Sequence, residues 1–147
     1  IARDYNINVK NIEKLISKKT KAIVPVHLNG RSCDMDAVMK IAKKYNLIII
    51  EDTAQSLGAK FKNKMAGTFG KAGCFSLHPL KSLGCAGDGG FVATNDKKLY
   101  EKISRLRNHG QITRDDIAHY GFCSRLDNLQ AALLNTKFKS FKNNVNE

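Results

Sequence analysis

The chain of 147 residues is 42% hydrophobic and 26% charged, a composition typical of a globular domain with a buried core rather than of a disordered segment. It has no apolar run of about eighteen residues, so we expect no membrane span. Its net charge of +12 comes largely from lysines spread over helix ends and turns, without a dense basic block or aromatic residues between them, so we expect no nucleic-acid partner.

The first part of the chain predicts alternating helices and strands. Apolar residues recur at helical spacing over residues 8–18, and a short apolar strand follows at 21–27. The next helix is expected at 33–46, with Asp34 as its cap and lysines in its last turn, before an apolar strand at 47–52. An unbroken apolar run of this kind suits a strand covered on both faces. The order predicts an α/β fold in which a mostly parallel sheet is flanked by helices.

The second part of the chain contains fewer periodic segments. Glycines and polar residues separate them, and no internal repeat or linker divides the chain. The expected elements are an exposed turn at 60–71, strands at 72–78 and 90–95, a helix from a cap at Asp96 to about Asn108 that ends at Gly110, an irregular stretch at 111–122, and a helix at 125–138.

Polar side chains follow two of the predicted strands. Asp52 ends the strand at 47–52, with Gln55 on the turn beyond it, and Ser76 and Lys81 lie at and just past the end of the strand at 72–78. In an open parallel sheet, chemistry collects at this carboxyl edge. A lysine that can form an imine, a carboxylate for a ring nitrogen and a hydroxyl for a phosphate are what pyridoxal phosphate requires. Taken singly, each residue also has an ordinary interpretation: a solvated lysine, a helix-capping aspartate and a strand serine.

The cysteines favour neither a metal site nor a thiol enzyme. None of the four forms a CxxC pair, and the chain shows no basic and apolar leader segment, so we expect free thiols in a reducing cytoplasm. A zinc site would need ligands from scattered loops. Cys74 and His78 would lie about 13 Å apart along a strand, too far for a direct hydrogen bond.

Several motifs in combination resemble those of the DegT/StrS-type nucleotide-sugar aminotransferases, which are pyridoxal-phosphate enzymes of the aspartate aminotransferase fold. The resemblance extends from about residue 8 to residue 138. The segments that carry it are "TKAIVPVHLNGRSCDMDAV" (20–38), "EDTAQSLGA" (51–59), "GCFSLHPLKSLGCAGDGG" (73–90), "LRNHG" (106–110) and "GFCSRLDNLQAALL" (121–134).

The resemblance implies a role for each of the polar residues at the predicted sheet edge. Lys81 stands at the Schiff-base lysine, Asp52 at the carboxylate that pairs with the pyridinium nitrogen, Gln55 at an amide contacting the ring and its hydroxyl, and Ser76 at a phosphate-binding hydroxyl. The implied reaction transfers an amino group, from glutamate, to a keto-sugar nucleotide for amino-sugar, surface polysaccharide or secondary-metabolite synthesis.

The sequence departs from the family pattern at one position. Cys123 stands where many members have an asparagine that reaches the partner subunit's cofactor phosphate, and a thiol is a weaker donor than an amide. Ser124 is the alternative donor, and a homodimer is still implied. We expect residues 1–147 to be part of the large cofactor-binding domain, without its N-terminal part and without the C-terminal small domain.

Two other functions remain open. One is a pyridoxal-phosphate-dependent sugar dehydratase of the same superfamily, in which a histidine typically replaces the lysine; Lys81 favours transamination. The other is an inactive fragment that serves only as a dimerisation or binding module.

Overall fold

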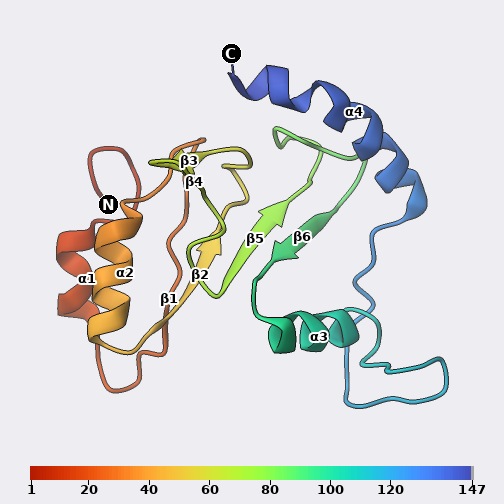
Figure 1. The fold of residues 1–147 in the computed structure, drawn as a ribbon, viewed down its shortest axis with the longest axis horizontal. Helices are drawn as coiled ribbons and strands as arrows, with labels where there is room; N and C mark the ends of the chain where they lie inside the picture. Colours follow the sequence, from red (N-terminus) through yellow and green to blue (C-terminus); the bar gives the residue numbers. More distant parts are fainter. Residues whose placement is uncertain (147) are drawn as a thin grey trace.

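The computed structural model describes residues 1–146 and shows an α/β fold built around a four-stranded sheet in the order β1-β2-β5-β6 (Figure 1). The described residues also form a two-stranded hairpin and four helices. The elements are α1 (Val9–Leu15), β1 (Ala22–Ile23), α2 (Met35–Lys44), β2 (Ile48–Asp52), β3 (Lys60–Phe61), β4 (Lys64–Met65), β5 (Ala72–Ser76), β6 (Gly90–Ala93), α3 (Lys97–Leu106) and α4 (Asn128–Asn146).

Three of the four sheet strands run parallel, which confirms the predicted fold class. β1 pairs with β2, and β2 with β5, in parallel register, so the carboxyl ends of β2 and β5 meet at one edge. The last strand, β6, returns antiparallel to β5 through the glycine-rich loop between them. Residues 60–71, predicted as an exposed turn, contain the antiparallel β3–β4 hairpin.

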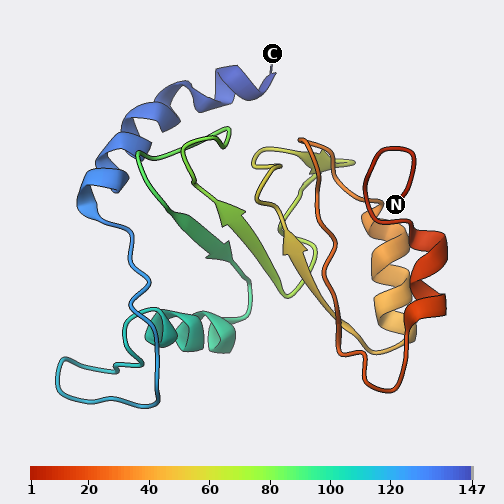
Figure 2. The ribbon, with the colours of Figure 1, turned by 180° about the vertical axis from the view of Figure 1, so that it is seen from behind.

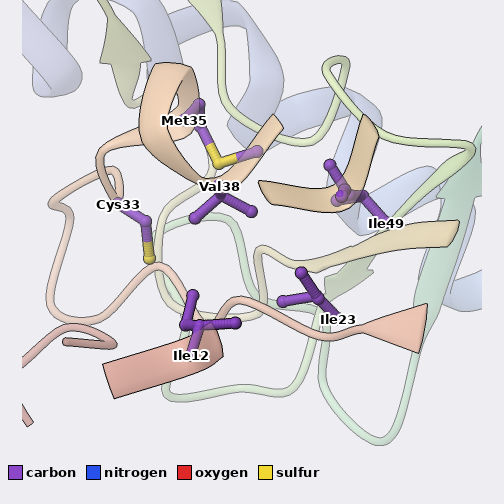
Figure 3. Close-up of a cluster of buried hydrophobic side chains, with 7 residues drawn as sticks. Ile12, Ile23, Cys33, Met35, Val38 and Ile49 are labelled. Carbon is purple, nitrogen blue, oxygen red and sulfur yellow. The ribbon is translucent and has the colours of Figure 1, made fainter. Parts of the chain in front are cut away.

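Helices α1 and α2 cover one face of the sheet. Ile12, Met35 and Val38 from the helical side pack against Ile23 of β1 and Ile49 of β2 (Figure 3). Met35 and Val38 are fully buried, so this cluster removes from water the apolar side chains that the two helices share with the sheet. It fixes the orientation of β2 and therefore the position of the residues that follow it.

The opposite face of the sheet is more open. Side chains alternate along a strand, so the neighbours of the buried Ile23 and Ile49 point away from the helices. Val24 and Ile48 are 53% and 46% exposed, and Val92 on β6 is 43% exposed. The polar end of β2 opens on this same face, because Asp52 is four residues after Ile48.

A second apolar cluster joins α4 to the loop between β5 and β6. Leu77, Leu83 and Cys85 of the loop pack with Leu134 and Phe141 of α4. Figure 2 shows α4 beside this loop, at the end of the sheet remote from α1 and α2. The side chain of Gln130 also accepts a hydrogen bond from the main-chain N–H of Ala86 at 2.8 Å. Helix α4 thus supports the segment that carries Lys81.

The predicted helix starts were more accurate than the predicted ends. Asp34 caps α2 by accepting from the Ala37 N–H at 3.1 Å, and Asp96 caps α3 in the same way. Helix α1 stops three residues before the predicted limit, because Ile16 is extended and its N–H bonds to the Glu13 carbonyl. Helix α4, expected at 125–138, runs over Asn128–Asn146. No helix in the described part of the chain is both long and apolar enough to cross a bilayer.

Strand β1 is shorter than the sequence predicts. Its continuous ladder ends at Ile23, and Pro25 has no main-chain N–H to donate to the ladder with β2. Pairing resumes beyond the proline, where Val26 forms an isolated parallel bridge with Asp52. The chain after β1 therefore stays beside the carboxyl end of β2.

Candidate active site

A cavity of about 350 Å³ opens at the carboxyl ends of β2 and β5. Three consecutive residues from the end of each strand line it. Because side chains alternate along a strand, Ile50 and Asp52 of β2 share one face with Cys74 and Ser76 of β5. Asp52 and Ser76, from the strand ends, are thereby brought to one hollow. Its lining consists of Val24, Ile50, Glu51, Asp52, Ala54, Cys74, Phe75, Ser76 and Gly89.

The Asp52 carboxylate is held in a defined orientation. Its Oδ1 accepts the Ala54 N–H at 3.0 Å. Its main chain joins the segment after β1 on both sides: the Asp52 N–H bonds to the Pro25 carbonyl at 3.0 Å, and the Asp52 carbonyl accepts the His27 N–H at 2.9 Å. In the described residues Oδ2 has no hydrogen-bond partner, so one carboxylate oxygen remains available to a ligand in the cavity.

Cys74 lies next to Asp52 in the β2–β5 register. Burial and the negative charge of Asp52 both raise the pKa of the Cys74 thiol. At neutral pH the thiol therefore stays protonated, so Cys74 lines the cavity as an uncharged side chain and does not act as a nucleophile.

Ser76 completes the polar part of the cavity. Its Oγ accepts the His78 N–H at 3.2 Å, which leaves the hydroxyl proton free to be donated elsewhere. Gly90 faces Ser76 across the β5–β6 ladder, where a Cβ would lie 2.7 Å from the Phe75 carbonyl oxygen. The close approach of the two strands at the hydroxyl therefore depends on glycine.

Gln55 and Lys81 lie near this edge but do not line the cavity. Gln55 is exposed, and its Oε1 accepts the Asn29 N–H at 3.3 Å. Lys81 is half-buried on the turn after β5, where its main-chain N–H bonds to the His78 carbonyl at 2.9 Å. The turn itself lies between Leu77 and Leu83, which α4 holds in place.

Cys123 and Ser124 are exposed and belong to a different part of the chain. Cys123 forms an isolated bridge with Asn108, and the Ser124 N–H bonds to the Arg107 carbonyl at 2.9 Å. Both residues are thus attached to the C-terminal end of α3, and neither lines the cavity. Of the predicted site residues, Asp52 and Ser76 share the cavity. Gln55 and Lys81 follow the ends of β2 and β5 in the chain without lining it, and Cys123 and Ser124 lie beside the end of α3.

The sequence interpretation missed two buried polar residues beside the cavity. His27 and Glu51 are both 0% exposed, and His27 Nε2 lies 3.0 Å from Glu51 Oε2. The available signal was the position of Glu51: a carboxylate one residue before Asp52, in a strand expected to be covered on both faces, must enter the interior.

Comparison with known proteins gives one family. Residues 1–147 match the DegT/DnrJ/EryC1/StrS aminotransferase family. A UDP-N-acetyl-3-dehydro-alpha-D-glucosamine 3-aminotransferase from Acidithiobacillus ferrooxidans is 46% identical over 138 residues, which cover 92% of this chain and 37% of that protein. The chain therefore spans little more than a third of the curated relatives it matches, 36% and 37% for two of them.

Solved structures agree with the sequence match. PseC from Helicobacter pylori, an aminotransferase involved in pseudoaminic acid biosynthesis, has a TM-score of 0.91 at 36% identity, covering 97% of this chain and 39% of PseC. GDP-4-keto-6-deoxy-D-mannose-3-dehydratase from E. coli, with bound hydrated PLP, has a TM-score of 0.85 at 27% identity, covering 93% and 40% of the two chains. This chain is a member of the DegT/DnrJ/EryC1/StrS aminotransferase family.

Proposed function

We propose that this chain forms part of the active site of a pyridoxal-phosphate-dependent aminotransferase that moves an amino group from glutamate to a keto-sugar nucleotide. The observation that carries the proposal is the cavity that Asp52 and Ser76 share at the carboxyl edge of the sheet, in a member of an aminotransferase family. Amino-sugar synthesis, for surface polysaccharides or secondary metabolites, follows from the sugar-nucleotide relatives. The proposed location is the cytoplasm.

The residues of the cavity fit the cofactor chemically. The uncommitted Oδ2 of Asp52 can accept the N–H of a pyridinium ring, a charge-assisted hydrogen bond that keeps the ring electron-poor. The free hydroxyl proton of Ser76 can be donated to a phosphate oxygen. A volume of about 350 Å³ lies within the range of small-molecule sites. When bound, pyridoxal phosphate supplies an electron sink for charge at the α-carbon of the amino donor.

Lys81 is the proposed catalytic residue. Its Nζ would be the amine that holds the cofactor, and, once displaced by the amino donor, it would act as the general base and acid that moves the α-carbon proton. Gln55 is proposed to contact the cofactor ring through its amide. Ser124, with Cys123 in the asparagine position, is proposed to contact the phosphate bound by a partner subunit of a homodimer.

We assign residues 1–147 to the large cofactor-binding domain of a longer enzyme, with an N-terminal part and a C-terminal small domain supplied by further polypeptide. The length of the relatives supports this assignment, because they extend well beyond the matched region. The remaining cofactor and sugar contacts would come from those parts, so this chain alone should bind the cofactor weakly.

A dehydratase is the second candidate, because one solved neighbour is a sugar 3-dehydratase. The resemblance places a histidine at the lysine position of such enzymes, whereas this chain has Lys81. The presence of an amine at this position favours amino transfer.

Borohydride reduction in the presence of pyridoxal phosphate, followed by peptide mapping, tests the proposal. We expect the reduced cofactor on Lys81, loss of that label in Lys81→Ala, and its retention in Lys64→Ala, which removes an exposed lysine of the β3–β4 hairpin. Asp52→Asn should weaken cofactor binding, whereas Asp88→Asn, an exposed aspartate outside the cavity lining, should not. Label distributed over surface lysines, with none specific to Lys81, would refute the proposal. It would favour the alternative function, an inactive fragment that serves as a dimerisation or binding module.

A further inference from the structure

Two buried titratable residues have no part in the proposed reaction. Glu51 immediately precedes Asp52 in β2, so its side chain points to the opposite face of the sheet from the Asp52 carboxylate. His27 follows β1 and is equally buried. Burying a carboxylate without hydrogen-bond partners is costly, so the groups that surround the Glu51 carboxylate indicate its role.

The Glu51 carboxylate is saturated by four hydrogen bonds from the protein. Oε1 accepts the N–H groups of Phe69 and Gly70 at 2.6 and 2.7 Å. Oε2 accepts the Gly67 N–H at 2.7 Å and lies 3.0 Å from His27 Nε2. Burial acts to raise the pKa of Glu51, but the bonds from His27 and from these three N–H groups lower it below its ordinary value.

The orientation of the His27 ring follows from its second contact. The main-chain N–H of Cys33 donates to His27 Nδ1 at 3.0 Å. Nδ1 is therefore the acceptor of the ring, and Nε2 carries the proton that Glu51 accepts. Through this ring the carboxylate is connected to the loop that precedes α2, and through its other bonds to residues 67–70.

The main chain around His27 is bonded to the turn that carries the candidate site residues. The His27 N–H donates to the Asp52 carbonyl at 2.9 Å, and the His27 carbonyl accepts the Ser56 hydroxyl at 2.6 Å. Further along, the Gly30 N–H donates to the Gln55 carbonyl at 3.0 Å. Residues 27–30 are therefore hydrogen-bonded along the 52–56 turn, and the His27 side chain joins this segment to Glu51 by a further hydrogen bond.

We propose that Glu51 and His27 are positioning residues for the cofactor site. Their hydrogen-bonded pair holds residues 27–30 and residues 67–70 onto the end of β2, which fixes the orientation of Asp52 and Gln55. A carboxylate is needed at position 51 because three buried N–H groups converge there, and an apolar or amide side chain cannot accept from all of them together with His27. This inference rests on the proposed function, since it concerns the same cavity.

The experiment compares Glu51→Gln and His27→Phe with a surface control, Asp36→Asn, which removes an exposed carboxylate from α2. Without cofactor, we expect amide hydrogen exchange at Gly67, Phe69 and Gly70 to accelerate at least tenfold in Glu51→Gln, while the amides of α2 remain protected. With pyridoxal phosphate, we expect the dissociation constant to rise about tenfold in both site variants and to be unchanged in Asp36→Asn. His27→Gln, which can still donate to Glu51, should recover most of the affinity.

The outcomes separate this inference from the proposed function. Unchanged exchange at residues 67–70 together with unchanged cofactor affinity in Glu51→Gln overturns the positioning role, whether or not Lys81 is labelled. Absence of cofactor on Lys81 in the unmodified chain overturns the proposed function, while the exchange data still decide whether Glu51 holds the two segments. If Glu51→Gln fails to fold, His27→Phe against His27→Gln decides: equal cofactor affinities of the two variants overturn the positioning role.

Discussion

Replacing Gly67 by alanine should destabilise the chain through both its backbone and its packing. Gly67 has φ +86°, a conformation that L-residues adopt at a cost of about 1–2 kcal/mol. A Cβ at this position would lie 2.3 Å from Phe75 Cζ and 2.9 Å from Phe75 Cε2. The Phe75 ring cannot move freely, because it stacks on Phe91 with ring centroids 4.4 Å apart and planes at 6°. Relieving such an overlap adds about 1–3 kcal/mol.

Gly30 provides a matched control for the backbone part of this cost. It has φ +77°, and apart from its chain neighbours no atom of the described residues lies within 4 Å of the position that its Cβ would take. Gly30→Ala should therefore lose only about 1–2 kcal/mol, whereas Gly67→Ala should lose about 2–5 kcal/mol. The difference between the two variants isolates the packing term.

Urea unfolding followed by far-UV circular dichroism measures both losses, and the chain has no tryptophan to follow instead. Gly67→Ala should also disturb the hydrogen bond from the Gly67 N–H to Glu51, so its effect should extend to cofactor binding. Equal losses of unfolding free energy in the two variants would refute the packing argument, because the backbone cost alone would then account for Gly67.

Three further predictions concern single side chains. The pKa of Glu51 in the folded chain lies below its ordinary value of 4.5, so the stability that the ionised carboxylate contributes is present above about pH 4.5 and is lost as the pH falls through the folded pKa. The urea midpoint of the unmodified chain should therefore fall in acid. This fall should be smaller in Glu51→Gln. Asp34→Ala, which removes the α2 cap, should cost about 1 kcal/mol and Asp34→Asn much less, as measured by thermal unfolding; equal losses would argue against the capping bond. Iodoacetamide should alkylate the exposed Cys123 before Cys74, whose thiol pKa is raised, and peptide mass spectrometry showing the reverse order would contradict this environment for Cys74.

Local sequence signals determined which segments are helices and, for α1, α2 and α3, where they begin. The caps at Asp34 and Asp96 act within three residues of their partners, so the pattern that predicts them is contained in the helix itself. The apolar runs at 47–52 and 72–78 likewise predicted two strands with polar residues at their ends. From these alone, Asp52 and Ser76 were expected at one sheet edge, and both line one cavity.

Tertiary structure decided the features that depend on distant partners. β6 runs antiparallel because the loop after β5 turns back beside it, and α4 extends beyond its predicted end, where Phe141 packs against the loop between β5 and β6. Glu51 could be expected to enter the interior, but its donors at His27, Gly67 and Gly70 are brought to it only by the folded sheet. Helix signals act between residues within one or two turns, whereas strand pairing and buried hydrogen bonds join segments far apart in the chain, so their partners are set only when the whole domain packs.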